Sequence, residues 1–230
     1  LVSCFWENQT DTQLINAVNS EFGTNIAVEE FSRVAQNLRT TYIDYSDYYD
    51  PTTKNNLDLV QWAIEAHSSG WGYVWGTYGH VLTRSYYEAK LAQYPEGVGN
   101  YADFILANWL GKRTADCVGL VKGYCWFDPE AQSIGYAVNG MPDIATEQMI
   151  EWCDEKGSMD TMPEIPGLLL WMDGHVGIYI GDGYAIEAMG TRYGVVKTQV
   201  AGRGWQKWGK IPSIEYIEEA EETEPAEAVG

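Results

Sequence analysis

Residues 166–188 read PGLLLWMDGHVGIYIGDGYAIEA, and their pattern decides the fold. Apolar side chains recur here with a period of two, which is typical of β-strands. Pro166–Gly167 opens the first strand, Asp173–Gly174 is a strong signal for a two-residue hairpin, and Gly181–Gly183 forms a second turn. The stretch therefore predicts three consecutive antiparallel strands.

The segments on either side extend this sheet and place helices before it. Residues 193–200 and 205–217 continue the strand pattern, so we expect about five to six strands in total. Apolar positions three to four residues apart predict helices upstream. These helices are expected over residues 10–23, 25–38, 55–70 (with Asn56 as N-cap and Gly70 as the stop), 85–112 (with a loop at 94–100) and from 117 onward. Helices followed by an antiparallel meander indicate the α+β class.

The net charge is strongly negative, because 33 acidic residues against 14 basic ones give −19. A duplex nucleic-acid surface needs clustered Lys and Arg, so this charge argues against a nucleic-acid partner and against anionic lipid. No run of about 18 apolar residues is present, so we expect no membrane helix within the chain. We expect the low-complexity, acidic residues 218–230 to be disordered and the protein to be a monomer.

The start of the chain has two interpretations. The opening LVSC resembles the end of a bacterial lipoprotein signal that closes on Cys4. Because the chain does not begin with Met, the alternative is a boundary within a longer protein.

One cysteine lies at the start of a predicted helix. The four cysteines contain no C-x-x-C pair, and none of the three possible disulfide pairings is favoured. Asp116 is a good N-cap, which places Cys117 in the first turn, where unpaired backbone N–H groups lower a thiol pKa. This placement favours a nucleophile over a zinc ligand, since the cysteines lack ligand spacing. Cys125 is expected in the core, and Cys4 and Cys153 have no supporting context.

A cysteine nucleophile needs a base, and the histidines are His67, His80 and His175. His175 starts a strand directly after a tight turn, where a rigid backbone can present a side chain to a cleft; a lone histidine in a strand is more often structural. If the second turn has three residues, Gly177 faces Glu187, which then neighbours His175 diagonally on the same face, beside open space. A carboxylate there can hold one imidazole nitrogen. A turn of two or four residues would put Glu187 on the other face.

Three blocks of sequence occur together in an order found in a known family. ADCVGLV at residues 115–121 is similar to the motif D-C-S-G-[LF]-V, and residues 166–188 are similar to a block that begins P-G-D-L and contains H-V-G-I-Y. Residues 59–76 are similar to a helix followed by Y-x-W-G. Across about residues 57–211, the chain therefore resembles the NlpC family of bacterial cell-wall cysteine peptidases.

The resemblance implies a papain-like α+β fold, in which the cysteine helix packs on an antiparallel sheet that carries the histidine. It also implies hydrolysis of amide bonds in peptidoglycan stem peptides, commonly between γ-D-glutamate and a diamino acid, with no metal and no cofactor. Cys117 matches the nucleophile, His175 the base and Glu187 the third polar residue. Tyr73 matches a tyrosine that assists substrate or oxyanion binding. Asp116 matches the acid before the cysteine, to which we assign helix capping and, as a second role, substrate contact.

Four features depart from the family pattern. Glu187 stands where the family usually has His, Asn or Gln, Val118 replaces the Ser after the nucleophile, and PGD is PGL here. The segment between Tyr73 and Cys117 is long, so residues 80–112 are interpreted as an insertion that roofs the cleft and alters specificity. The expected organisation is a helical extension or linker over 1–56, a peptidase domain over 57–217 and an acidic tail over 218–230.

The resemblance leaves three functions to compare. The first is an endopeptidase that cleaves stem peptides, and the second is an N-acetylmuramoyl-L-alanine amidase of the same superfamily. The third is an inactive wall-binding or structural domain of a secretion or phage apparatus, against which the presence of Cys117, His175 and Glu187 counts. We expect an extracellular or cell-wall location, as a lipoprotein or as part of a larger secreted or phage protein.

Overall fold

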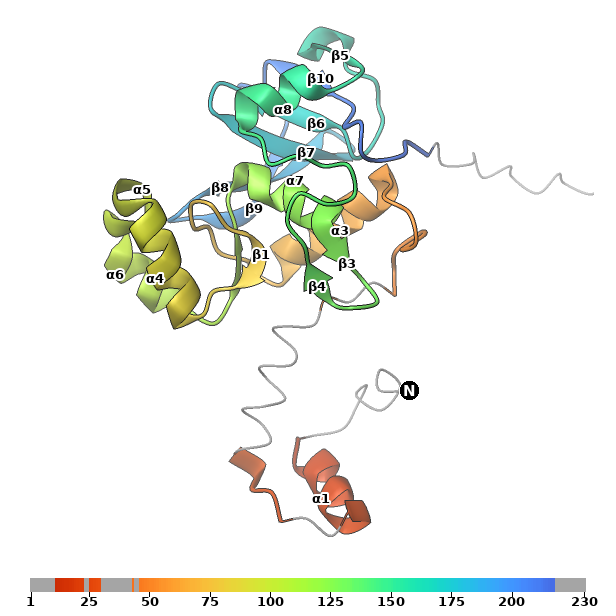
Figure 1. The fold of residues 1–230 in the computed structure, drawn as a ribbon. Coiled ribbons are helices and arrows are strands. Elements are labelled where there is room, and N and C mark those ends of the chain that lie inside the picture. The colour runs from red at the N-terminus through yellow and green to blue at the C-terminus, as the bar shows by residue number, and fades with distance from the viewer. Residues whose placement is uncertain (1–10, 23–24, 30–42, 44–45, 218–230) are drawn as a thin grey trace, which may run out of the picture.

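The structure is a computed structural model, and it describes residues 11–22, 25–29, 43 and 46–217. Its centre is a six-stranded antiparallel sheet in the order β5-β10-β6-β7-β8-β9 (Figure 1). The strands are β5 (Lys156–Ser158), β6 (Leu169–Met172), β7 (His175–Gly181), β8 (Tyr184–Gly190), β9 (Gly194–Gln199) and β10 (Lys207–Gly209). With helices packed on this sheet, the predicted α+β class and strand number are confirmed.

The three strands predicted over residues 166–188 are β6, β7 and β8. Met172 pairs with His175 across the expected Asp173–Gly174 turn. The second turn differs from the prediction. It has two residues, Asp182 and Gly183, both with positive φ (53° and 74°), as a type I′ turn requires.

A bulge in β7 corrects the register that this shorter turn would otherwise give. The pairing shifts between Tyr179 and Gly181, so that Ile178 lies opposite Ile186. An extra residue in one strand restores the face on which the following side chains point. Gly177 and Glu187 therefore lie together as predicted, although the predicted loop length was wrong.

The edge of the sheet departs from a simple meander. The last strand, β10, does not continue beyond β9 but lies between β5 and β6. The edge strand β5 had no clear sequence signal, because it is three residues long, KGS.

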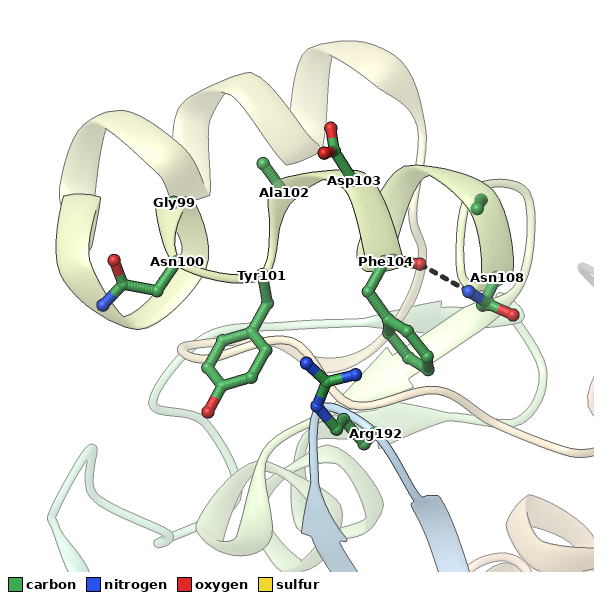
Figure 2. A pocket seen from close by; sticks show the side chains of 9 residues that line it. Gly99, Asn100, Tyr101, Ala102, Asp103, Phe104, Asn108 and Arg192 are labelled. Atoms are coloured by element: carbon green, nitrogen blue, oxygen red, sulfur yellow. Dashed lines mark hydrogen bonds between the residues drawn. The ribbon is translucent and has the colours of Figure 1, made fainter.

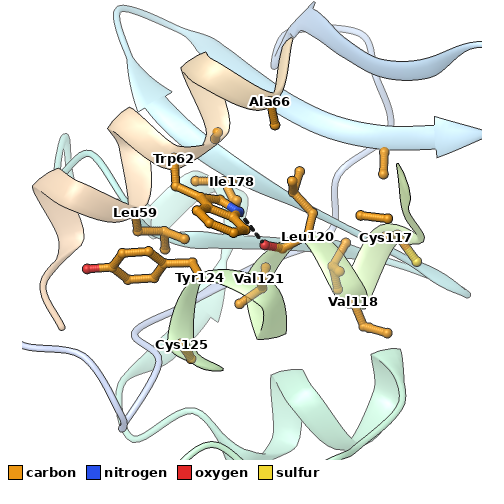
Figure 3. Close-up of a cluster of buried hydrophobic side chains, with 14 of the residues drawn as sticks. Leu59, Trp62, Ala66, Cys117, Val118, Leu120, Val121, Tyr124, Cys125 and Ile178 are labelled. Atoms are coloured by element: carbon orange, nitrogen blue, oxygen red, sulfur yellow. Dashed lines mark hydrogen bonds between the residues drawn. The ribbon is translucent and has the colours of Figure 1, made fainter. Parts of the chain in front are cut away.

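Helices α3 (Asn56–Ser68) and α7 (Cys117–Trp126) pack on the sheet. Trp62 of α3 joins them by donating from its indole Nε1 to the Leu120 carbonyl at 2.9 Å (Figure 3). The N-cap of α3 is Asn55, one residue before the predicted Asn56, because the Asn55 side chain accepts from the Asp58 N–H. Asn56 instead donates to the Pro166 carbonyl at the entrance to β6.

Three short helices lie within residues 80–112, the segment interpreted above as an insertion, and they share apolar packing around Val74, Leu82, Tyr87, Val98 and Ile105. They are α4 (Arg84–Gln93), α5 (Pro95–Gly99) and α6 (Ala102–Asn108). The loop expected at 94–100 is mostly α5, because proline suits the first position of a helix.

The remaining described elements are short apart from one helix. They are α1 (Asp11–Phe22), β1 (Tyr78–Val81), β2 (Arg113–Ala115), β3 (Phe127–Asp128), β4 (Ser133–Ile134), α8 (Thr146–Trp152) and the 3₁₀ turn η2 (Met159–Thr161). The helix α1 was predicted. Most of the helix predicted over 25–38, and all of the tail 218–230, lie outside the described residues. In the part of the chain that is described, no helix has the length and hydropathy needed to cross a membrane.

A cavity of about 540 Å³ lies between α5, α6 and the β8–β9 turn (Figure 2). Arg192 of that turn places its guanidinium 5.7 Å from the Tyr101 ring and 5.5 Å from the Phe104 ring. A hydrogen bond from Trp109 to the Thr191 carbonyl fastens the same region. Neither this cavity nor a smaller one, of about 290 Å³ beside α3, is lined by the predicted catalytic residues.

Candidate active site

Asp116 positions Cys117 at the start of α7. It has extended backbone geometry and its carboxylate accepts from the Gly119 N–H at 2.6 Å, as an N-cap does. Its other oxygen accepts from the Gly76 N–H at 2.7 Å. Both oxygens are thus engaged by backbone groups of the protein, which fits the predicted capping role and leaves less capacity for contact with a substrate.

Two glycines let the chain before β1 lie against α7. A Cβ on Gly119 would lie 1.9 Å from the Thr77 carbonyl oxygen, and one on Gly123 would lie 2.3 Å from that of Tyr78. Only glycine permits so close an approach. This contact brings residues 73–78 alongside the first turns of the helix and places Tyr73 near Cys117.

The Cys117 thiol is 9% exposed, and its surroundings oppose ionisation. Burial, followed by the charge of Asp116, raises the thiol pKa to about 12. The N–H groups of Val176, Val118 and Cys117 itself act in the opposite direction but contribute less. The expectation that the helix start would make this thiol acidic is therefore wrong, because desolvation outweighs the field of the helix end.

His175 and Glu187 form the predicted pair. The His175 Nε2 and Glu187 Oε2 atoms are 2.7 Å apart, and the Glu187 side chain is fully buried, while that of His175 is 14% exposed. Since Nε2 is engaged, Nδ1 is the nitrogen that remains for a nucleophile.

The strand that presents His175 passes Cys117. Val176, the next residue in β7, directs its N–H toward the Cys117 thiol and lowers its pKa. Among the described residues, no direct hydrogen bond joins Cys117 to His175. Catalytic hydrogen bonds of this kind often form only when substrate is bound.

Glu187 has further partners that the sequence did not reveal. Thr198 of β9 donates to its Oε1 at 2.7 Å, and Arg203 donates from Nε to Oε1 at 2.8 Å and from Nη2 to Oε2 at 2.7 Å. Burial alone would raise the carboxyl pKa, but the hydrogen bonds from His175, Arg203 and Thr198 lower it to about 2. Glu187 is therefore an ionised acceptor at neutral pH.

Trp205 covers the pair from the segment after β9. Its ring is stacked on the His175 imidazole, with centroids 5.7 Å apart and planes at 15°. A Cβ on Gly177 would lie 2.8 Å from the Trp205 ring, so indole fills the space that we expected to be open. No sequence signal linked Arg203 or Trp205 to the pair, although Trp205 opened a segment predicted as a strand.

Tyr73 lies beside the nucleophile and is buried. Burial first, and then the negative charges of a Cys117 thiolate and of Asp116, raise its pKa. Its hydroxyl therefore stays protonated and can donate a hydrogen bond to an anionic group near the sulfur.

The remaining candidates are not brought to this site. His80 packs against the rings of Tyr78 and Tyr86, with centroids 4.8 Å and 5.7 Å away. His67 lies in the last turn of α3. Cys125 and Cys153 are buried free thiols, and Cys4 lies outside the described residues; Figure 3 shows Cys117 and Cys125 at opposite ends of α7.

Comparison with known proteins gives matches among solved structures. No protein-family model and no curated protein matches this chain. The NlpC/p60 domain of the peptidoglycan hydrolase SagA is 19% identical with a TM-score of 0.39, and the match covers 68% of this chain and 99% of that domain. The p60 domain of an antigen from M. avium subspecies paratuberculosis is 22% identical with a TM-score of 0.40, covering 69% and 97%.

A third match is the peptidoglycan hydrolase RipB from Mycobacterium tuberculosis. It is 18% identical with a TM-score of 0.41, and the match covers 84% of this chain and 88% of that structure. Of these three matches, the SagA domain bears the NlpC name.

Proposed function

We propose that this protein is a peptidoglycan hydrolase, a cysteine peptidase that cleaves amide bonds of stem peptides through an acyl-enzyme on Cys117. The observation that carries the proposal is the position of Cys117 at the start of α7, beside the strand that presents the hydrogen-bonded pair of His175 and Glu187. A nucleophile, a base and a group that orients the base are the parts that acyl transfer needs.

The raised pKa of Cys117 indicates how the first step proceeds. Because the thiol is protonated at neutral pH, His175 removes its proton as the sulfur attacks the amide carbonyl. The new S–C bond forms, and the Cys117 N–H at the helix start and the Tyr73 hydroxyl stabilise the oxyanion. The C–N bond then breaks, and the amine leaves with the proton from His175. Water, deprotonated by His175, hydrolyses the thioester and frees the thiol.

The substrate class is what the resemblance of the sequence motifs to the NlpC family implies. That resemblance favours the bond between γ-D-glutamate and the diamino acid, and SagA and RipB are also named peptidoglycan hydrolases. We further propose that residues 57–217 are the peptidase domain, that α4–α6 alter its specificity, and that the protein acts outside the cell or at the cell wall.

Digestion of purified peptidoglycan tests this function. We expect wild-type protein to release fragments whose masses identify a cut within the stem peptide. Cys117→Ala should abolish release, whereas Cys125→Ala, which alters a buried cysteine of the same helix, should retain it. Fragments carrying a free muramic acid lactyl group would instead identify an amidase. Equal release by the Cys117→Ala variant would refute the proposal.

A further inference from the structure

The segment that follows β9 contacts both His175 and Glu187. Arg203 donates two parallel hydrogen bonds, of 2.8 Å and 2.7 Å, to the Glu187 carboxylate. Two residues later Trp205 stacks on His175, and the Arg203 guanidinium lies 5.7 Å from the Trp205 ring. Residues 203–205 therefore contact both members of the pair.

We propose, on the basis of the proposed function, that Arg203 is a positioning residue: it fixes the orientation of the Glu187 carboxylate for His175 and offsets its charge. Arg203 acts through Glu187 and does not touch the reacting sulfur.

The first argument is the saturation of the carboxylate. Oε1 accepts from Thr198 and Arg203, and Oε2 accepts from His175 and Arg203. A carboxylate has about four acceptor positions, and here all are used. The planar fork of arginine matches the plane of a carboxylate, so the two bonds leave Glu187 one orientation, in which Oε2 faces His175.

The second argument is charge. A fully buried carboxylate needs a compensating cation, since an uncompensated buried charge is strongly unfavourable. If His175 were the only cation near Glu187, the carboxylate would favour the protonated imidazole, which is useless as a base. Arg203 supplies a permanent positive charge, so His175 can lose its proton without leaving Glu187 uncompensated.

The charged and titratable groups near His175 come from β8, from the segment after β9 and from the start of α7. Glu187 binds His175 from β8, and Arg203 binds Glu187 from the segment after β9. Cys117, with Asp116 before it, lies at the start of α7 against the N–H of Val176, the residue after His175. Replacement of Arg203 by a neutral residue therefore makes the environment of His175 more negative. The acid limb of the pH–activity profile should then move to a higher pH.

The test measures kcat, KM and pH profiles on the stem-peptide fragment that the wild-type protein cleaves. We expect Arg203→Met to lower kcat by about 10²-fold with little change in KM, and to move the acid limb upward. Arg203→Lys, which keeps the charge but not the fork, should restore the pH profile and only part of kcat. Arg192→Met, a matched control on another turn of the same sheet, should leave both unchanged.

A double-variant cycle separates positioning from general support of the fold. If Arg203 acts through Glu187, adding Arg203→Met to Glu187→Gln should cost little beyond Glu187→Gln alone. Losses that multiply in the double variant, or an Arg203→Met variant with an unchanged pH profile, would overturn the proposal. Urea unfolding of each variant shows whether a loss of activity is caused by a loss of folded protein. If Arg203→Met does not fold, Arg203→Lys is the variant that decides the test.

A second readout does not depend on the proposed function. The rate at which iodoacetamide labels Cys117 can be followed against pH in wild type and in Arg203→Met. We expect labelling in the variant to change with pH over a different range, because removal of the guanidinium changes the charge around His175. A wild-type protein that is inactive on peptidoglycan but shows this difference would refute the function and support the role of Arg203. Identical labelling profiles would refute that role.

Discussion

Asp116 and Glu187 are two buried carboxylates, each beside a candidate catalytic group, and they are stabilised in opposite ways. Asp116 accepts hydrogen bonds from two neutral backbone N–H groups, and burial raises its pKa. Glu187 is bonded to His175, Thr198 and Arg203, and its pKa falls to about 2. Neutral donors fix the geometry of a helix start, whereas charged donors fix both geometry and charge.

The two carboxylates therefore support the site in different ways, Asp116 at Cys117 and Glu187 at His175. The start of α7 sets the position of Cys117, but its thiol is hard to ionise there, because burial, and after it the Asp116 charge, act against the thiolate. The β7–β8 hairpin supplies an ionised carboxylate for His175. Removal of the Cys117 thiol proton therefore depends on the His175–Glu187 pair of the hairpin. Substitutions of Asp116 and of Glu187 should have different effects.

The largest effect is expected for Glu187→Ala. It leaves the Arg203 guanidinium and the His175 imidazole without their buried partner, and breaking such a pair costs about 3–5 kcal/mol. Urea unfolding measures the change in the free energy of unfolding. A loss below about 1 kcal/mol would mean that water replaces the carboxylate and that the pair is not the support we describe.

The next effect is the acid sensitivity of the same residue. The folded pKa of Glu187 is about 2, against an ordinary value of 4.5, so its ionised form stabilises the fold above pH 4.5. That contribution, about 3 kcal/mol, is lost as the pH falls from about 4.5 to 2. Free energies of unfolding measured across this pH range should show this loss of stability. Glu187→Gln should remove the part of the pH dependence that protonation of Glu187 causes. An equal slope in the variant would assign the acid sensitivity to other groups.

A smaller effect is expected for Asp116→Ala. The variant loses an N-cap and leaves the N–H groups of Gly76 and Gly119 without an acceptor, at a cost of about 2 kcal/mol. Urea unfolding should show a loss smaller than that of Glu187→Ala measured in parallel. The reverse order would contradict the comparison of neutral and charged donors.

The smallest effect concerns the thiol itself. Asp116→Asn removes a negative charge near Cys117 while keeping an acceptor for one N–H group, so the thiol pKa should fall by less than about one unit. The pH dependence of iodoacetamide labelling reports this pKa. Cys117→Ala, measured in the same way, identifies the labelled residue. A midpoint that rises would show that loss of the cap outweighs loss of the charge.

Much of the fold was predictable because its signals are local. The hairpin at Asp173–Gly174, the three strands of residues 166–188 and the cap of α7 by Asp116 each depend on residues close together in the chain. The short strand β5 and its pairing with β10 were not predictable, since three residues carry no periodicity.

The site was predictable only in part. Counting along a hairpin brought Glu187 to His175, although the true turn is one residue shorter and a bulge at Gly181 restores the register. Arg203 could not be assigned to Glu187 by counting, because it lies in an irregular segment beyond β9. Their roles in a reaction remain predictions that the experiments above test.

The sequence by itself determined the three strands of residues 166–188, the Asp173–Gly174 turn, the helix that begins at Cys117 and the residues worth testing, because those features follow from local propensity and spacing. The tertiary structure decided the ionisation of these groups. The same helix start that favours a thiolate in water holds a neutral thiol when burial and Asp116 surround it. A buried glutamate, in turn, stays ionised because His175, Arg203 and Thr198 donate hydrogen bonds to it. Desolvation and charge pairing depend on neighbours distant in the chain.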